Sequence, residues 1–483
     1  MITNDATLLK VKHEVLYEVA KLAYAGRLEE ERDSLPYKMV PGPQPAFRCC
    51  IYREREVIRQ RIRLAEGKAP GAEDDGNIVQ VINSACEGCP ISRYVVTDNC
   101  QKCMGKACQA ACRFGAISMG RDKSYIDPSK CKECGQCAKA CPYNAIADLV
   151  RPCMKSCPVD AISVADNGTG IAVINQDKCI QCGSCVHKCP FGAIGSKTFI
   201  VDIIKKMRSD IKVFAMLAPA TIGQFGADIT MASWRTALKK IGFYDVVDVS
   251  LGADMTAMSE AKELIEAKEK GEKKTTSCCP AFVNMVKKHF PEVWDCVSTT
   301  VSPMCAVSRM IKAKEPEAVT VFIGPCIAKK AESMSGEKDT ADYALTYGEI
   351  RAMLRAKGVK LEPEEDADDQ GSIYGKKFAN AGGVTAAVLE SMKELGCTGD
   401  VSVCKCSGIT ECKKALTLMK VGRLPEDFVE GMVCEGGCVG GPSRHRDPNL
   451  AMRDRNAALA KSSDILIKDN LDKQNAESVD MIR

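Results

Sequence analysis

Two cysteines stand four residues apart in a glycine-rich stretch near the carboxyl end of the sequence. The stretch is Cys434–Gly441 (CEGGCVGG), and ionised thiols are soft ligands that bind transition metals. Glycine permits a positive φ and a close approach of the backbone, so this loop can fold around an inorganic group. By itself the loop fits a metal cluster, a zinc site or an ordinary turn. The other cysteines must decide among these three.

Two regular cysteine runs indicate iron–sulfur chemistry. Cys131–Pro142 and Cys179–Pro190 both read C-x2-C-x2-C-x3-C-P. This is the spacing of bacterial ferredoxins, in which three thiolates hold one [4Fe–4S] cluster and the fourth often ligates a neighbouring one. The endings CPYNAI and CPFGAI are echoed by ACRFGAI and SCPVDAI, so the motif is repeated four times. Zinc is the alternative for C-x2-C pairs, but a three-cysteine run ending in C-P suits one tetrahedral ion poorly.

The sixteen cysteines between residues 86 and 189 are enough to saturate four clusters. The two regular runs and the irregular Cys100 quartet are expected to hold three clusters, and Cys86, Cys89, Cys153 and Cys157 a fourth. Which cysteine ligates which cluster stays open, because paired motifs exchange ligands. Such a string of clusters transfers single electrons. The expected ligands are Cys86, Cys89, Cys100, Cys103, Cys108, Cys112, Cys131, Cys134, Cys137, Cys141, Cys153, Cys157, Cys179, Cys182, Cys185 and Cys189.

Composition narrows the class of protein. The 483 residues include 29 cysteines, and 67 basic residues nearly balance 63 acidic ones, which argues against a nucleic-acid partner. Charges already occur within the first twelve residues, and no uncharged run approaches the ~18 residues of a membrane span. We therefore expect a cytoplasmic protein with no membrane partner. In a reducing compartment, closely spaced cysteines indicate metal or redox chemistry rather than disulfides.

The amino-terminal part, 1–76, is expected to be helical. Apolar residues recur at helical spacing over residues 7–33, a second helix is predicted over Tyr52–Glu66, and Ala69–Gly76 reads as a linker. We interpret this part as a docking element. The adjacent Cys49 and Cys50 are expected to be buried free thiols. Residues 77–197 would then form α+β ferredoxin-like cluster domains.

From residue 198 the pattern alternates between buried strands and amphipathic helices. Strands are predicted over Val213–Leu217, Val246–Val249 and Val319–Ile323, and helices over Met231–Ile241, Met255–Lys270, Tyr347–Lys357 and Val384–Leu395. This predicts an α/β domain over 198–449. Ligands of such domains gather on loops at the carboxyl ends of strands, where three cysteine motifs fall. They are Thr276–Phe282 (TSCCPAF), Gly324–Glu332 (GPCIAKKAE) and Cys434–Gly441.

The polar tail, 450–483, is expected to be peripheral, with one short helix over Ala457–Ile467. Cys397, Cys404, Cys406 and Cys412 form a further local group. They could hold zinc or another cluster, but ordinary buried or surface thiols are the favoured interpretation.

Together the three loops resemble the signature segments of the catalytic domain of [FeFe]-hydrogenases, over residues 212–445. The repeat region resembles the accessory-cluster domains of this family. The resemblance implies an α/β catalytic domain whose two lobes surround an H-cluster. This is a [4Fe–4S] cluster joined through a cysteine sulfur to a two-iron unit with CO, cyanide and azadithiolate ligands. Gly324, Met304 and Glu435 depart from the usual residues, which suggests a divergent, monomeric branch.

The resemblance assigns roles position by position. Cys279, Cys326, Cys434 and Cys438 match the cubane ligands, and Cys438 matches the one shared with the two-iron unit. Cys278 matches the proton-shuttling cysteine and Lys329 the lysine that donates to a cyanide. Ser298, Glu260 and Glu263 match a proton relay, with a solvated helix face as the alternative for the glutamates. Residues matching the cofactor surroundings are Ala218, Pro219, Ala220, Ser302, Pro303, Gly382, Gly383 and Met432.

The function implied is reversible H2 oxidation and proton reduction, with electrons relayed to ferredoxin or a similar carrier. It would operate anaerobically, with an H-cluster and three to four additional [4Fe–4S] clusters, and would need hydrogenase maturation proteins. Two alternatives belong to other classes. One is an H2 or redox sensor with low turnover, and the other is a hydrogenase-like iron–sulfur scaffold protein.

Overall fold

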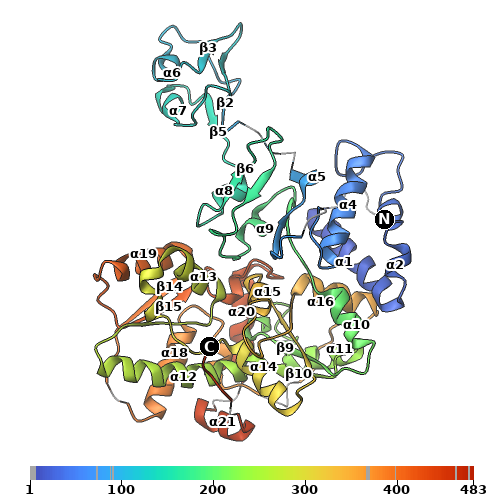
Figure 1. Ribbon diagram of the computed structural model, residues 1–483, viewed down its shortest axis with the longest axis vertical. Coiled ribbons are helices and arrows are strands. Elements are labelled where there is room, and N and C mark those ends of the chain that lie inside the picture. Colours follow the sequence, from blue (N-terminus) through green and yellow to red (C-terminus); the bar gives the residue numbers. More distant parts are fainter. Residues whose placement is uncertain are drawn as a thin grey trace.

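A computed structural model describes residues 7–71, 74–86, 89, 92–365, 370–397, 399–462, 465–476 and 479–483 of the chain. A large α/β region carries the helical amino-terminal part on one side. An inner cluster unit rests on this region, and an outer cluster unit stands beyond the inner one (Figure 1). Among the described residues, no helix combines the length and the apolar character needed to cross a bilayer.

The amino-terminal helices pack onto the α/β region. They are α1 (Leu8–Ala25), α2 (Leu28–Glu31), α3 (Leu35–Met39) and α4 (Ile51–Ala65). In α1, Val11, Val15 and Val19 recur every four residues and are buried, and this face packs against α16 (Tyr347–Ala356) and α10 (Ile200–Met207). The helix predicted over Tyr52–Glu66 is confirmed, whereas the one predicted over 7–33 ends at Ala25, because Gly26 adopts a left-handed conformation with a φ of 73°.

The prediction that Cys49 and Cys50 are buried is wrong, because both thiols are exposed. Cys50 is the residue that caps α4, and Cys49 Sγ accepts a hydrogen bond from Arg53 Nη1 at 3.5 Å. The interior position belongs to Glu54, which is fully buried. Its carboxylate accepts hydrogen bonds from the backbone N–H groups of Ala46 at 2.9 Å and Arg48 at 2.6 Å. The turn before α4 therefore faces its backbone inward and its thiols outward.

The cluster region consists of two ferredoxin-like units. The outer unit has β2 (Tyr94–Val96), α6 (Ala107–Ala110), β3 (Ile117–Met119), β4 (Ser124–Ile126), α7 (Gln136–Ala140) and β5 (Ile146–Asp148). The inner unit has β1 (Val79–Val81), α5 (Asn83–Cys86), α8 (Pro152–Lys155), β6 (Ile162–Val164), β7 (Ala172–Ile174), α9 (Ser184–Lys188) and β8 (Ile194–Ser196). In both units the strands pair antiparallel, β2 with β5, β3 with β4, β1 with β8 and β6 with β7.

The backbone conformation is the same at one position in all four copies of the cysteine motif. The residue three positions after the last cysteine of each copy has a positive φ: 62° at Gly115, 48° at Asn144, 50° at Asp160 and 59° at Gly192. Asparagine, aspartate and glycine tolerate this left-handed conformation better than other residues do. The four copies therefore share one turn that ends the cysteine motif.

The larger sheet of the α/β region is parallel, in the order β10-β9-β12-β13. Its strands are β9 (Val213–Leu217), β10 (Asp245–Asp248), β12 (Val319–Gly324) and β13 (Tyr343–Thr346). Among the surrounding helices are α11 (Met231–Ile241), α12 (Val249–Glu269), α14 (Pro303–Lys314) and α16. The predicted strands and helices occur within a residue or two, except that α12 begins at Val249, where Asp248 accepts a hydrogen bond from Ser250 N at 2.9 Å.

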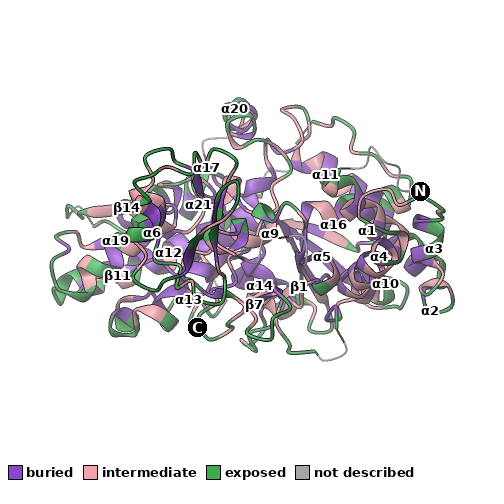
Figure 2. Ribbon diagram, turned by 90° about the horizontal axis from the view of Figure 1, so that it is seen from above, coloured by how far each residue is buried: buried purple, intermediate pink, exposed green. Residues whose placement is uncertain are grey.

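A second parallel sheet, in the order β11-β15-β14, forms the other lobe. It comprises β11 (Lys274–Thr275), β14 (Val403–Ser407) and β15 (Phe428–Met432), with α13 (Pro280–His289), α18 (Gly383–Glu394) and α19 (Ile409–Lys420) nearby. These strands were not predicted from the sequence, because β11 is very short and β14 alternates cysteine with lysine. Buried residues are concentrated within the α/β region that the two sheets form (Figure 2). The three cysteine loops follow β11, β12 and β15, as predicted.

The prediction of a peripheral tail is wrong. Residues 463–464 of the predicted helix lie outside the described residues, and the flanking chain forms α20 (Pro448–Leu459) and α21 (Ile467–Gln474). Arg455 is fully buried, and its guanidinium donates to Pro219 O at 2.5 Å and to Asn380 Oδ1 at 2.8 Å. The polar composition of the tail suggests an exposed segment. Arg455 is nevertheless buried, because it donates hydrogen bonds to buried carbonyl groups, and composition does not reveal this pairing.

Candidate active site

The three cysteine loops line one cavity. Cys279, Cys326, Cys434 and Cys438, the predicted cubane ligands, all line it. Cys278, Lys329 and part of the predicted cofactor surroundings also line it, namely Ala218, Pro219, Ala220, Pro303 and Met432. Two sheets and three loops that are far apart in the sequence thus present their side chains to one space.

The glycines of the third loop allow close backbone contacts. Gly437 has a φ of 83°, and a Cβ added there would approach Ala379 O to 2.5 Å. Cys438 N donates to the same carbonyl at 2.8 Å, so this contact holds the Cys438 thiol in place. A Cβ on Gly441 would approach Pro325 O to 2.8 Å, which joins the third loop to the second.

Gly382 and Gly383 lie beside the cavity rather than among the residues that line it. Gly382 N donates to Glu430 Oε1 at 2.7 Å, and a Cβ on Gly383 would approach Lys377 O to 2.1 Å. This glycine pair allows the start of α18 to pack tightly. Ser302, another predicted cofactor neighbour, caps α14 by accepting a hydrogen bond from Cys305 N at 3.4 Å.

The four thiols fit an iron–sulfur cluster. Burial raises the pKa of Cys326 to about 11 and of Cys438 to about 12, and that of Cys434 well above its usual value, and the neighbouring thiols add to each shift. Four ionised thiolates in this cavity require compensating positive charge, which bound iron provides. One thiolate for each iron of a [4Fe–4S] cluster matches the donor set.

Lys329 and Cys278 present a cation and a thiol to the same cavity. Burial alone lowers the pKa of Lys329, but the Glu332 carboxylate, at 2.6 Å from Nζ, more than offsets this, so the net pKa is raised. Ser302 Oγ donates to the other oxygen of Glu332 at 2.5 Å. Burial and the neighbouring Glu260 raise the pKa of Cys278 well above its usual value. Cys278 is therefore a protonated thiol beside a charged ammonium group.

The two glutamates of the predicted relay have different environments. Glu260 is 1% exposed, and its Oε1 accepts hydrogen bonds from Ser277 N at 2.9 Å and Ser277 Oγ at 3.0 Å. Burial raises the pKa of Glu260 to about 7. Glu263 accepts a hydrogen bond from Thr299 N at 3.1 Å and one from Thr300 Oγ1 at 3.3 Å. Glu260 therefore contacts the loop before α13, whereas Glu263 contacts the segment that follows it.

Ser298 is buried in the same segment, and its Oγ accepts a hydrogen bond from Thr300 N at 3.1 Å. Among the hydrogen bonds of the described residues, none joins Ser298 to Glu260 or Glu263. Ser277, Thr299 and Thr300 supply the hydroxyl groups that bond the glutamates instead. These three residues were not predicted from the sequence, although Ser277 adjoins Cys278 in the TSCC motif. Nor was Glu332, which lies one helical turn after Lys329 in the quoted GPCIAKKAE segment.

The accessory cysteines form four sets, each drawing its fourth thiol from another repeat. Cys141 joins Cys100, Cys103 and Cys108 around one cavity, and Cys112 joins Cys131, Cys134 and Cys137 around a second. Cys157 joins Cys179, Cys182 and Cys185 around a third. The remaining thiols surround Cys153, whose pKa is raised to about 11 by burial and by the neighbouring Cys189, Cys86 and Cys89. This grouping is the one that ligand exchange between paired ferredoxin motifs would give.

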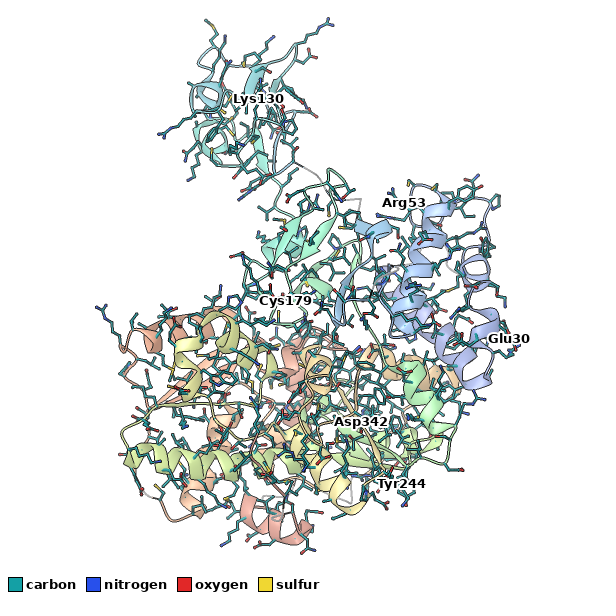
Figure 3. All side chains as sticks on the ribbon, in the orientation of Figure 1. Glu30, Arg53, Lys130, Cys179, Tyr244 and Asp342 are labelled. Atoms are coloured by element: carbon teal, nitrogen blue, oxygen red, sulfur yellow. The ribbon has the colours of Figure 1, made fainter. Side chains whose placement is uncertain are left out.

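The third of these cavities adjoins the catalytic loops. Cys182 and Cys279 interact electrostatically, as do Cys182 and Cys434. Lys288 Nζ, from α13, donates to Cys179 O at 2.8 Å. Figure 3 shows Cys179 where the inner unit meets the α/β region, with Lys130 far away in the outer unit. One set of the inner unit therefore lies beside the catalytic thiols, and the outer unit stands beyond it (Figure 1).

The Cys404 group shares a core with thiols of both cluster regions. Cys406 and Cys412 are buried in an apolar core against which Cys182 and Cys279 also pack, and the sulfur atoms of Cys404 and Cys406 are 3.9 Å apart. The interpretation of this group as ordinary thiols stays a prediction.

The fold and the site define an iron–sulfur oxidoreductase. Residues 211–442 match the family described as iron only hydrogenase large subunit, C-terminal domain. Residues 124–147 match a 4Fe-4S binding domain and residues 151–193 a 4Fe-4S dicluster domain. The chain therefore belongs to the iron hydrogenase family, as the resemblance implied.

Two curated relatives illustrate the similarity. Iron hydrogenase 1 of Clostridium pasteurianum is 31% identical over 385 residues, which cover 68% of this chain and 66% of that protein. The periplasmic [Fe] hydrogenase large subunit of Nitratidesulfovibrio vulgaris is 28% identical over 305 residues, covering 51% of this chain and 72% of that protein. A solved structure of HydA(deltaEFG), an [FeFe]-hydrogenase, covers 58% of this chain and 93% of its own, at 23% identity with a TM-score of 0.49.

Proposed function

We propose that this protein interconverts H2 with two protons and two electrons. The observation that carries the proposal is the convergence of four half-buried thiols, a buried fifth thiol and a lysine on one cavity, beside an accessory cysteine set. Family membership supports the same chemistry. When bound, an H-cluster supplies the redox-active iron at which the H–H bond is made and broken.

The residues around the cavity would have different roles. Cys279, Cys326 and Cys434 would hold the cubane, and Cys438 would be shared with the two-iron unit. Lys329 would donate a charge-assisted hydrogen bond to an anionic ligand of this unit. The apolar side chains that also line the cavity, among them Met304, Phe322 and Phe378, would exclude water. This exclusion strengthens each electrostatic interaction inside.

Protons would enter and leave through side chains of this chain. The Cys278 thiol lines the cavity, and the pKa of Glu260, raised to about 7 by burial, allows this carboxyl group both to accept and to release a proton near neutral pH. Ser277 holds Glu260 in place. Beyond Glu260, the hydroxyl group of Thr300 and the carboxylate of Glu263 would continue the path.

Electrons would travel through the accessory sites. We infer three to four additional [4Fe–4S] clusters held by the four cysteine sets, and ferredoxin or a similar one-electron carrier as the partner. Hydrogenase maturation proteins would be needed to install the two-iron unit. A reducing, anaerobic, cytoplasmic setting is part of this proposal, because it keeps the 29 cysteines from forming disulfides.

A second candidate is an H2 sensor with the same cofactor and slow turnover. The observation that favours it is the relay geometry, in which Ser298 bonds Thr300 N instead of either glutamate. A scaffold protein, the remaining alternative, would bind cubanes and would not need Lys329 or Cys278 in the cavity.

The test uses protein that is matured and purified anaerobically. We expect infrared bands of CO and cyanide, an iron content that matches the H-cluster plus the accessory clusters, and H2 evolution from a reduced dye. A matured protein that lacks these infrared bands would refute the cofactor assignment and leave the scaffold. Bands without appreciable turnover would favour the sensor.

A further inference from the structure

The last residues of the sequence, 479–483, pair with the segment that contacts the relay glutamates. Val301 N donates to Met481 O at 2.8 Å, and Arg483 N donates to Thr299 O at 2.8 Å. Thr300 and Ile482 form an antiparallel bridge between these two hydrogen bonds. The segment 479–483 is thus fixed along residues 299–301, the same residues whose amide and hydroxyl groups bond Glu263.

Arg309 anchors this segment from α14. Its Nη1 donates to Asp480 O at 2.7 Å and to Ile482 O at 2.8 Å. These two carbonyls lie on either side of Met481, so the guanidinium group holds the backbone on both sides of the pairing. All of these contacts use the backbone of 479–483, and they leave the Arg483 side chain free to reach elsewhere.

The Arg483 side chain reaches Ser277. Its Nη2 donates to Ser277 O at 3.2 Å, and Ser277 donates both its N–H and its hydroxyl group to Glu260 Oε1. One residue therefore separates the guanidinium group from the buried carboxyl group. Glu260 Oε2 is buried and has no hydrogen-bond partner among the described residues, so the position of Glu260 depends on Ser277.

Three charged or titratable groups act on Glu260. Glu263 lies one turn further along α12, and Cys278 approaches from the TSCC loop. Both disfavour a charged carboxylate. Arg483 favours it, because opposite charges attract, and it acts from the side of the 479–483 segment. A carboxyl group that must exchange protons near neutral pH requires such a balance.

We propose that Arg483 is a positioning residue for proton transfer, which holds Ser277 against the Glu260 carboxyl group and supplies the positive charge that this group faces. The inference rests on the proposed function, since a proton relay through Glu260 serves H2 chemistry. Loss of the guanidinium group removes the cation that favours the charged form of Glu260, so only the hydrogen bonds from Ser277 still oppose burial and the charge of Glu263. The backbone pairing of 479–483 does not depend on the side chain, so a substitution at Arg483 isolates its charge and its hydrogen bond.

The test compares Arg483→Gln, Arg483→Lys and the control Arg423→Gln in the holoenzyme. Arg423 is exposed, so its substitution removes the same charge at a site away from the relay. Infrared difference spectra would follow the carboxyl C=O band of Glu260, assigned with Glu260→Gln. We expect the Arg483→Gln midpoint to rise by about 0.5 to 1 pH unit, less than the ~1–3 units of a directly paired charge. Arg483→Lys should recover most of the shift.

The pH profile of turnover gives a second measurement. H2 oxidation needs Glu260 as a carboxylate and proton reduction needs it protonated, so both limbs should move to higher pH in Arg483→Gln, with an unchanged KM for the dye. The inference is overturned if the Glu260 midpoint is the same in Arg483→Gln and Arg423→Gln, or if Arg483→Lys does not restore it. The carboxyl band can be titrated without turnover, so absence of activity and of CO bands would refute the proposed function separately.

Discussion

Gly183 of the inner cluster unit lies directly against Ile327 of the catalytic domain. A Cβ added at Gly183 would come to 2.5 Å from Ile327 Cδ1 and to 2.9 Å from Ile327 Cβ. Each residue follows a cysteine that lines its own cavity, Cys182 in the inner unit and Cys326 in the catalytic domain. The absence of one side chain thus allows the accessory cysteines and the catalytic cysteines to approach each other.

Substitution of Gly183 by alanine should therefore slow electron delivery to the active site. Gly183→Ala adds a steric clash to a left-handed backbone with a φ of 77°. Displacement of the inner unit by about 1 Å should cost on the order of tenfold in turnover, because misplacements of this size can cost up to ~100-fold. The measurement is H2 evolution driven through the accessory clusters, compared with evolution from a small dye.

Gly168→Ala is the matched control for this variant. Gly168 has a φ of 75° and no atom within 4 Å of an added Cβ, so it carries the same backbone cost of roughly 1–2 kcal/mol without a clash. Equal effects of the two substitutions would mean that backbone strain, not the contact with Ile327, matters at Gly183.

The exchanged cysteine sets predict which substitutions remove the same cluster. Cys112 and Cys134 line one cavity, whereas Cys108 lines the other cavity of the outer unit. Cys112→Ala and Cys134→Ala should each cost about four iron atoms, and their combination should cost no more. Cys112→Ala combined with Cys108→Ala should cost about eight. The measurements are iron analysis and electron paramagnetic resonance of the anaerobic protein. Loss of two clusters from the double variant of Cys112 and Cys134 would contradict the grouping.

Cys278→Ser should abolish turnover and keep the cofactor. The thiol lines the cavity and is not one of the four ligands, so its loss removes a proton-transfer group. Such groups contribute about 10²–10⁴-fold. The infrared CO and cyanide bands and the iron content should stay at the wild-type level. Cys305→Ser, which alters a buried thiol outside the lining of the cavity, should remain active. A fully active Cys278→Ser protein would refute the relay assignment.

Glu332→Gln should destabilise the catalytic domain. Lys329 and Glu332 form a buried pair at 2.6 Å, with side-chain exposures of 10% and 9%. Removal of the carboxylate leaves an unpaired buried ammonium group, a change that costs about 3–5 kcal/mol. Glu390→Gln breaks a pair with Lys393 that is 3.0 Å long and largely exposed on the lysine side, which should cost about 0–1 kcal/mol. Anaerobic thermal unfolding measures both, and equal losses would contradict the role of burial.

Glu260 should make the stability of the domain depend on pH. Its folded pKa of about 7 lies above the ordinary value of 4.5, so the folded state binds the proton more tightly than the unfolded state does. The associated stability is fully present below the unfolded pKa and is lost as the pH rises toward and through 7. The loss is about 3 kcal/mol for a shift of this size.

Glu260→Gln should remove this dependence, because an amide keeps the hydrogen bonds to Ser277 and does not titrate. The measurement is the free energy of unfolding of the catalytic domain between about pH 5.5 and 8. Near pH 5.5 the wild-type protein keeps most of the stability that Glu260 contributes. Parallel pH curves for wild-type and variant protein would show that Glu260 does not carry this shift.

Local patterns in the sequence predicted most of the larger sheet. The strand at Val213–Leu217 and the helix at Met231–Ile241 occur as predicted, because apolar periodicity reports burial directly. The smaller sheet was missed. Its strand β14 contains Cys404, Lys405 and Cys406, and β11 has two residues, so neither has enough pattern to distinguish it from a loop. Tertiary pairing with β15 defines both strands.

Cysteine spacing alone determined that this protein binds iron–sulfur clusters and which thiols are available, because a cluster needs four soft ligands and the repeats supply them. Only the tertiary structure decided how these thiols are divided: Cys112 joins the next repeat, and Ser277 rather than Ser298 bonds Glu260. It also brought Arg483 to Ser277, more than 200 residues away in sequence. Ligand spacing is a local property that a motif records, whereas contacts between distant segments depend on how sheets and loops pack.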